Sequence, residues 1–234
     1  MSSILVQNTI LSLIITSITF GVLLSLNYLN KKKLITSEVS RKVVHIGAGT
    51  LYLAIYFYND YGYFSKYLNI FPYLFWTCIL IWKSQYHSSV RQQYDLVVGT
   101  ITRNNRPSEL LRGPLFFNIV TIICGTLLYK TILGSIIMGI LTWGDGLAAV
   151  IGARSGSRRK IYGNKTLDGS LTVFLVGIIA AITYTFILVG FQSVHVFKIC
   201  VISFVTAVIE TISPSDFDNL TIPLAIIVSY YFLF

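Results

Sequence analysis

The sequence predicts an all-α, polytopic integral membrane protein with seven to eight transmembrane helices. Hydrophobic residues make up 54% of the 234 residues and charged residues only 12%, whereas soluble domains are roughly 25% charged. The mean hydropathy is +0.72, and the apolar residues form runs close to the roughly 20 residues that a helix needs to cross a bilayer. This composition excludes an ordinary soluble domain, a disordered chain and a soluble nucleic-acid-binding protein.

Eight apolar segments are expected to form these helices, near residues 4–28, 43–58, 67–82, 114–130, 131–153, 170–191, 196–212 and 219–234. The first segment has no basic residue before it and no small-residue cleavage site after it, so we interpret it as a retained span and not as a secretory signal. The second, third and last segments are short for a bilayer, which leaves the count at seven to eight. No linker or convincing repeat divides the chain, so we expect one membrane domain over 1–234, with the first span and a basic loop at 1–40.

Fifteen of the 18 Lys and Arg residues lie in three polar segments, 31–42, 83–112 and 154–165. Because basic residues favour the cytoplasmic or equivalent loops, we expect all three segments on that side of the membrane. Most acidic residues lie at the same side, although acids barely affect topology. The sequence therefore predicts a charged functional site at the cytoplasmic or stromal face, and the segment 83–112 has the composition of a surface helix or a lid.

The span near 131–153 contains the strongest candidate for this site, Asp145. A charged side chain inside a membrane span costs ~2.5–3.5 kcal/mol on insertion scales, so such a residue is a functional candidate. Helical spacing places four residues on one face: Asp145, Ala149, Gly152 and Gly156. That face is acidic at one end and bare of side chains at the other, so the backbone can approach a bulky anion there.

Basic residues and a helix start follow this face directly. Arg154, Arg158, Arg159 and Lys160 precede a Tyr162-Gly163-Asn164 turn, and Lys165 and Thr166 come next. Thr166 or Asp168 is expected to cap a helix that begins near Ser170, whose N-terminus favours an anion. A carboxylate, small-residue backbone and cationic groups together are typical of a site for phosphate and a divalent cation.

Two further segments reach the same side of the membrane. Arg41, Lys42 and His45 open the second span, and Glu210 ends the seventh, shortly before Asp218. Glu210 lies at a depth where a carboxylate is poorly solvated, so packing alone does not account for it. We predict Glu210 and Asp218 as further metal contacts.

Each of these features also has a simpler structural interpretation. The basic run can anchor topology, the glycines of the Asp145 face can allow close helix packing, and Asp145 can belong to a buried ion pair. His45 can be an ordinary interfacial histidine, and Asp218 or Asn219 can cap the last helix. The site interpretation depends on all of these features occurring together.

Several motifs carry a resemblance to a known family. Asp145, Ala148, Gly152 and Gly156, followed by Asn164-Lys165-Thr166-Leu167-Asp168-Gly169-Ser170, resemble the CTP-binding signature of the polyprenol kinase family, which includes dolichol, phytol and farnesol kinases and CTP-dependent diacylglycerol kinases. Further matches are Arg41 to His45, Glu109 to Leu115, and Glu210 with Asp218 to Pro223. The resemblance covers about 40–234, and the Glu109 segment and the short chain are most similar to phytol and farnesol kinases.

This resemblance implies a CTP-dependent lipid kinase with Mg²⁺ as cofactor. Its substrate would be an isoprenoid alcohol (phytol, farnesol or geranylgeraniol), and its product would be the prenyl monophosphate. The enzyme would lie among membrane lipids and would have no nucleic-acid partner. ATP or UTP as donor stays open, since composition does not reveal the base.

The predicted roles follow from the motif positions. Asp145 binds Mg²⁺ or takes the alcohol proton, Lys165 holds phosphate with Arg154 and Arg158, and Asp145, Glu210 and Asp218 form the metal site. Gly152 and Gly156 admit the nucleotide, which Thr166, Asp168 and Gly169 also contact, while Arg41, Lys42 and His45 face the product phosphate. Two departures from the family pattern stand out: Asp168 replaces the usual glutamate, and Asn164 replaces the first lysine of a Lys-Lys pair.

Three alternatives remain at the sequence level. A phosphatidate cytidylyltransferase-like enzyme or a diacylglycerol kinase would share the nucleotide and the membrane acceptor. A transporter would use Asp145 and Glu210 as ion sites, although no inverted repeat is evident and the charges gather at one face.

Overall fold

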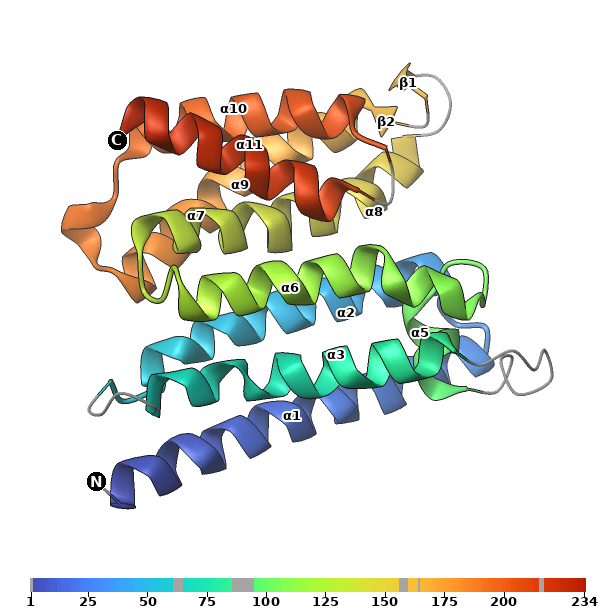
Figure 1. The fold of residues 1–234 in the computed structure, drawn as a ribbon. Coiled ribbons are helices and arrows are strands. Elements are labelled where there is room, and N and C mark those ends of the chain that lie inside the picture. Colours follow the sequence, from blue (N-terminus) through green and yellow to red (C-terminus); the bar gives the residue numbers. More distant parts are fainter. Residues whose placement is uncertain (1, 61–64, 86–94, 156–159, 164, 215–216) are drawn as a thin grey trace. The chain divides into compact units, whose positions relative to one another are not determined.

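The computed structural model describes residues 2–60, 65–85, 95–155, 160–163, 165–214 and 217–234. Within these ranges the chain is mainly helical (Figure 1). It divides into two compact units, Met1–Thr126 and Leu127–Phe234. The expected single domain over 1–234 stays a prediction.

The first unit contains four α-helices of ten or more residues in its described part. These are α1 (Ser2–Lys31), α2 (Ser37–Leu51), α3 (Phe71–Ser84) and α6 (Gly113–Thr126), with a short helix α5 (Leu96–Ile101) and the 3-10 turns η1 (Tyr52–Phe57), η2 (Ser65–Ile70) and η3 (Pro107–Leu111). Side chains cap two helix starts: the Thr36 hydroxyl accepts from Val39 N–H, and the Asp95 carboxylate accepts from Val97 and Val98 N–H. Such caps satisfy N–H groups that have no partner inside the helix.

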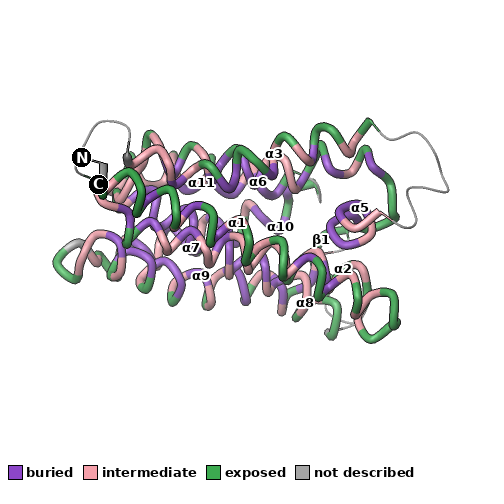
Figure 2. The backbone as a smooth tube through the Cα atoms, turned by 90° about the horizontal axis from the view of Figure 1, so that it is seen from below, coloured by how far each residue is buried: buried purple, intermediate pink, exposed green. Residues whose placement is uncertain are grey.

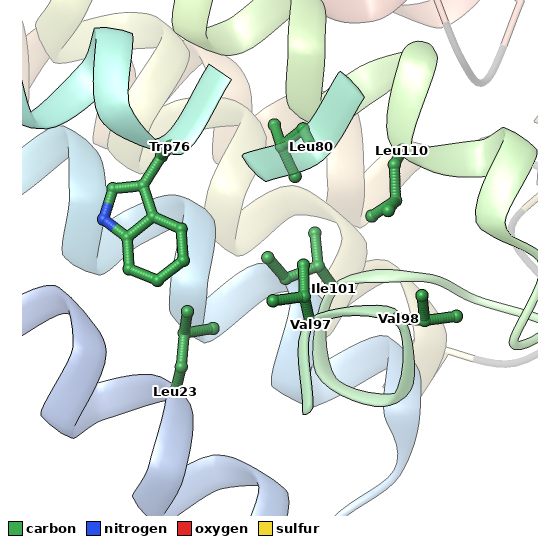
Figure 3. Packing of buried hydrophobic residues seen from close by; sticks show 7 residues of the cluster. All are labelled: Leu23, Trp76, Leu80, Val97, Val98, Ile101 and Leu110. Carbon is green, nitrogen blue, oxygen red and sulfur yellow. The ribbon is translucent and has the colours of Figure 1, made fainter. Parts of the chain in front are cut away.

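The core of the first unit includes part of the segment expected at the surface. Figure 3 shows seven buried side chains converging from α1, α3, α5 and η3: Leu23, Trp76, Leu80, Val97, Val98, Ile101 and Leu110. The segment 83–112 was predicted as a surface helix or lid. Its described residues instead contribute four of these core side chains, and Asp95 forms an ion pair with Lys83. The prediction is wrong for these residues, because their apolar side chains pack against neighbouring helices and not against a membrane surface. Residues 86–94 lie outside the described ranges.

The second unit is built around one long helix, α9 (Leu167–Leu188). The chain enters through a continuous helical rod made of α7 (Ile132–Gly139), the π-helical turn η4 (Ile140–Asp145) and α8 (Gly146–Ser155). A small hairpin of β1 (Lys160–Tyr162) and β2 (Lys165–Thr166) leads into α9, and η6 (Phe191–Ser193), α10 (Val196–Ile212) and α11 (Asp218–Leu233) follow. The rod and α10 pack against α9, while α11 packs against α10 and α7 (Figure 1).

Small residues allow the rod to approach α9 closely. A Cβ on Gly139 would lie 2.8 Å from the backbone nitrogen of Ala181, and one on Gly144 would lie 3.3 Å from the carbonyl oxygen of Val173. Small residues at helix crossings are typical of membrane bundles, where backbones approach until they contact. This close packing fixes where Asp145, the residue after Gly144, lies along the axis of α9.

Many exposed side chains are large and apolar, and many buried ones are polar. Figure 2 shows helices with a buried side and an exposed side, and the exposed side of α9 carries Leu167, Leu171, Leu175 and Ile179. Buried polar residues include Thr142, Ser203 and Thr206. A surface of this kind is unusual in water and expected in contact with lipid.

Four helices in the described ranges are long and apolar enough to cross a membrane: Ser3–Lys31, Pro107–Thr126, Ile132–Arg154 and Leu167–Leu188. The predicted count of seven to eight spans is therefore not confirmed. All eight predicted segments contain helix, but two of them combine an α-helix of at most 15 residues with a 3-10 turn, and α10 and α11 have 17 and 16 residues.

Candidate active site

Lys165 and Glu210 form an ion pair at one end of the second unit. Lys165 lies on β2 and Glu210 in the last turn of α10, and their side chains are 21% and 5% exposed. Burial lowers the pKa of Lys165, but the negative charges of Glu210, Asp218 and Asp145 outweigh this effect, so the pKa lies above its ordinary value. The lysine is therefore held protonated by three carboxylates.

The three carboxylates come from different parts of the chain. Asp145 ends η4, Glu210 lies near the end of α10, and Asp218 opens α11; all three residues are buried. One oxygen of Asp218 accepts the N–H of Asn219 at 3.0 Å. Glu210 contacts Lys165 and all three acids raise the pKa of this lysine, so the group Asp145–Lys165–Glu210–Asp218, called the acidic cluster below, combines three acidic side chains with one basic one.

Asp145 lies at the end of a π-helical turn inside a candidate membrane span. A π turn inserts an extra residue into a helix and is frequent at functional sites. Here the change from π to α geometry occurs directly after Asp145, at Gly146. The sequence identified Asp145 from the cost of its charge, but its spacing gave no sign of the π turn.

The hairpin and the first turn of α9 position Lys165. Gly163 has a φ of +53°, a left-handed conformation that glycine adopts readily. The Thr166 hydroxyl accepts the N–H of Gly169 at 3.2 Å and caps α9. The prediction of a cap at Thr166 or Asp168 is confirmed for Thr166, and the helix begins at Leu167 and not near Ser170.

The glycines near this cap support close packing. A Cβ on Gly152 would lie 2.7 Å from the Thr166 hydroxyl oxygen, and one on Gly169 would lie 3.2 Å from the Ala148 carbonyl oxygen. This geometry supports the packing interpretation for Gly152 and Gly169. Their predicted contact with a nucleotide stays a prediction, as does that of Thr166.

Hydroxyl pairs connect the helices that carry the acids. Ser170 and Thr211 hydroxyls lie 2.7 Å apart and join α9 to α10 next to Glu210. The hydroxyls of Ser213 and Thr221 are also paired, across the connection between α10 and α11. Thr211 and Thr221 are not among the residues predicted from the sequence, although Ser and Thr at helix ends beside acidic residues indicate such supports.

The remaining predicted residues of this unit fall into three groups. Arg154 is exposed at the end of α8, and Asp168 is half-buried in the first turn of α9. Gly156 and Arg158 lie outside the described residues. The alternative that Asp218 or Asn219 caps α11 is wrong, because the N-cap is Phe217 and Asp218 is already the first helical residue.

Arg41, Lys42 and His45 belong to the first unit. They lie on α2, where Lys42 is buried and the His45 ring lies 4.3 Å from the ring of Phe117. The contact with Phe117 explains the position of the imidazole by packing. Their predicted contact with the product phosphate stays a prediction.

The acidic cluster offers hard oxygen donors that suit Mg²⁺. Among the described residues, no group of three or more His, Cys, Asp or Glu side chains is arranged to hold a metal ion by itself. Mg²⁺ commonly takes one or two carboxylates and completes its shell with water and substrate phosphates. The excess of buried negative charge around Lys165 therefore fits a cation that arrives with a phosphate ligand.

The chain is similar to curated proteins from plants and a cyanobacterium. It is 27% identical over 234 residues to a probable chloroplastic phytol kinase 1 of Oryza sativa, covering 95% of this chain and 73% of that protein. Phytol kinase 1 of Arabidopsis thaliana is 27% identical over 225 residues, covering 92% and 73%. The phytol kinase of Synechocystis is 28% identical over 206 residues, covering 87% and 83%.

The chain is a homologue of the phytol kinases. Their similarity extends over both compact units, since each alignment covers most of the chain. This confirms the expected resemblance to the polyprenol kinase family, and within that family to the phytol kinases. No family model matches the chain, and no solved structure matches it significantly.

Proposed function

We propose that this chain is an integral membrane kinase that transfers the terminal phosphoryl group of CTP to the hydroxyl of an isoprenoid alcohol of the phytol type. Phytol is the first candidate acceptor because the curated relatives are named phytol kinases; farnesol and geranylgeraniol share its allylic or prenyl alcohol chemistry. The observation that carries the proposal is the acidic cluster, in which Lys165 is ion-paired with the buried Glu210 and the buried Asp145 and Asp218 also raise its pKa.

Phosphoryl transfer depends on positioning and charge neutralisation more than on covalent chemistry. A triphosphate would be repelled by the net negative charge of the acidic cluster unless a divalent cation came with it. One or two of Asp145, Glu210 and Asp218 would hold Mg²⁺ together with water and the substrate phosphates, and the ion would supply neutralisation of the phosphate oxygens. Lys165 would donate hydrogen bonds to a phosphate oxygen, and Asp145 would accept the proton of the attacking hydroxyl if it does not ligate the metal.

The acceptor chain can stay in lipid while its hydroxyl reaches the cluster. Leu167, Leu171, Leu175 and Ile179 form an exposed apolar stripe on α9 that begins two residues after Lys165. Residues four apart lie on one helix face. A prenyl chain lying along this stripe would end at the acidic cluster without leaving the bilayer.

The topology belongs to the same proposal. Eight spans would place the three basic segments, and with them the acidic cluster, on the cytoplasmic or stromal side. The gathering of 15 of the 18 Lys and Arg residues in these three segments supports this orientation.

The test is a donor and acceptor panel. Purified protein in lipid nanodiscs is incubated with γ-labelled CTP, ATP or UTP and with phytol, farnesol, geranylgeraniol or diacylglycerol. The expected result is Mg²⁺-dependent transfer of label from CTP to phytol, with release of CDP. Release of pyrophosphate would instead indicate a cytidylyltransferase, and the absence of lipid-dependent nucleotide consumption with every acceptor would favour a transporter.

A further inference from the structure

The hairpin places an exposed aromatic residue next to Lys165. Tyr162 on β1 is the register partner of Lys165 on β2 in the antiparallel pair. Side chains of directly opposed residues leave the same face of a sheet, with Cβ atoms roughly 4.5–5.5 Å apart. Tyr162 and Lys165 therefore start from one face of the hairpin.

The two side chains have opposite environments. The Lys165 amine is directed to Glu210, inside the acidic cluster, whereas Tyr162 is 61% exposed. Within the described ranges Tyr162 makes no ring contact and no side-chain hydrogen bond. Packing against the described residues thus gives no reason for a large aromatic residue at this position.

A nucleotide has a charged end and an aromatic end, as the pair of Lys165 and Tyr162 does. Its phosphates are anionic and match the lysine and the cation-binding carboxylates, while its base is a flat aromatic ring at the far end of the molecule. With the phosphates at Lys165, the ribose and base would extend toward the exposed part of the hairpin. Aromatic side chains are effective platforms for nucleobases, because every base has a face on which a ring can stack.

We propose that Tyr162 is the stacking surface for the base of the donor nucleotide. This inference rests on the proposed kinase function and adds a binding residue to it. The ring positions the base, and the Lys165 amine, at the other end of the pair, positions the phosphates. Stacking tolerates different bases, so Tyr162 contributes affinity for a nucleotide, while selection of cytosine requires other groups.

The alternative to a stacked base is that the exposed Tyr162 side chain contacts the membrane surface. Its neighbour on the strand, Ile161, is 53% exposed and has no register partner in β2, because the register of the pair shifts between Lys160 and Tyr162. A hairpin inserted into lipid would use both exposed side chains, whereas a stacked base uses only Tyr162, the register partner of Lys165. Ile161 is therefore a matched control one residue away.

The experiment compares Tyr162→Ala, Tyr162→Phe and Ile161→Ala in nanodiscs. We expect Tyr162→Ala to raise the KM for CTP about tenfold, with kcat and the KM for phytol close to those of the unchanged protein. Tyr162→Phe keeps the ring and should keep the KM, and Ile161→Ala should change neither constant. An unchanged KM for CTP in Tyr162→Ala would overturn the proposal, and so would a higher KM for phytol in both alanine variants, which indicates membrane insertion.

A binding measurement separates this proposal from the kinase function. In Tyr162→Trp, the added indole emission should be quenched by Mg²⁺ and CTP in the absence of any alcohol, while Ile161→Trp should show no quenching. Quenching without phosphoryl transfer in the unchanged protein would overturn the kinase function and retain the stacking surface. Equal responses of the two tryptophan variants would overturn the stacking surface, whatever the activity.

Discussion

At the level of single residues, we expect Lys165 and Glu210 to depend on each other for both stability and activity, because they form an ion pair. Removing one member of a buried ion pair leaves the other charge uncompensated, which costs about 3–5 kcal/mol for a fully buried pair. Lys165 keeps about a fifth of its side chain exposed, so we expect about 3 kcal/mol for Lys165→Met, measured by chemical unfolding in micelles. Lys160→Met is the matched control, because Lys160 is an exposed lysine of the same hairpin.

The double variant Lys165→Met with Glu210→Gln separates stability from function. It removes both charges of the ion pair but leaves Asp145 and Asp218 without the lysine, so we expect it to recover part of the lost stability while phosphoryl transfer stays absent. A single Lys165→Met variant with unchanged stability and turnover would contradict the role given to the ion pair.

Asp145 is the second prediction at the level of residues. Asp145→Asn preserves the shape of this buried side chain and removes its charge, so the bundle should stay folded while turnover falls about 100-fold or more, as for a lost acid-base or metal-binding group. The control is Asp60→Asn, an exposed acid of the first unit. Turnover that falls equally in both variants would show a general charge effect and not a role for Asp145.

The sequence predicted the members of the acidic cluster but not its surroundings. Asp145 and Glu210 were identified because a carboxylate in a membrane span needs a reason to be there, and both act on Lys165 in the structure. The sequence predicts Tyr162 only as part of a turn, because the pairing register of a three-residue strand cannot be inferred from so short a pattern.

At the level of secondary structure elements, the crossing of α8 and α9 can be tested at Gly152. Gly152→Ala would place a Cβ 2.7 Å from the Thr166 hydroxyl that caps α9, so we expect a loss of about 1–2 kcal/mol of stability from the displaced cap and the crowded crossing. Gly21→Ala is the control, because nothing lies within 4 Å of the added methyl group and alanine favours a helix.

The KM for CTP distinguishes the two interpretations of Gly152. If the glycine serves packing, the KM of the folded variant should be unchanged. Unchanged stability with a raised KM would contradict the packing role and support the predicted nucleotide contact.

The helices were predictable because apolar runs of the right length have few alternatives in a membrane. The hairpin, the π turn and the burial of α5 were not predictable in the same way. α5 has only six residues, and its apolar side chains are stabilised by contacts with Leu23, Trp76 and Leu80, which are remote in sequence.

At the level of the whole molecule, the membrane topology is tested by chemical labelling. In a chain whose Cys78, Cys124 and Cys200 have been replaced by Ala, single cysteines are introduced at Arg103, Lys160 and Lys130. With eight spans, the first two positions should react with an impermeant thiol reagent from one side of sealed vesicles and Lys130→Cys from the other. Labelling of positions 103 and 160 from opposite sides would contradict this topology.

The measurement that tests the central claim most directly is transfer of label from γ-labelled CTP to phytol by purified protein, run in parallel for the unchanged chain and Asp145→Asn. The account predicts labelled phytyl monophosphate and CDP from the unchanged chain, abolished by chelation of Mg²⁺ and reduced about 100-fold or more in the variant. No transfer to any prenol by correctly inserted protein, or equal transfer by both proteins, would contradict it.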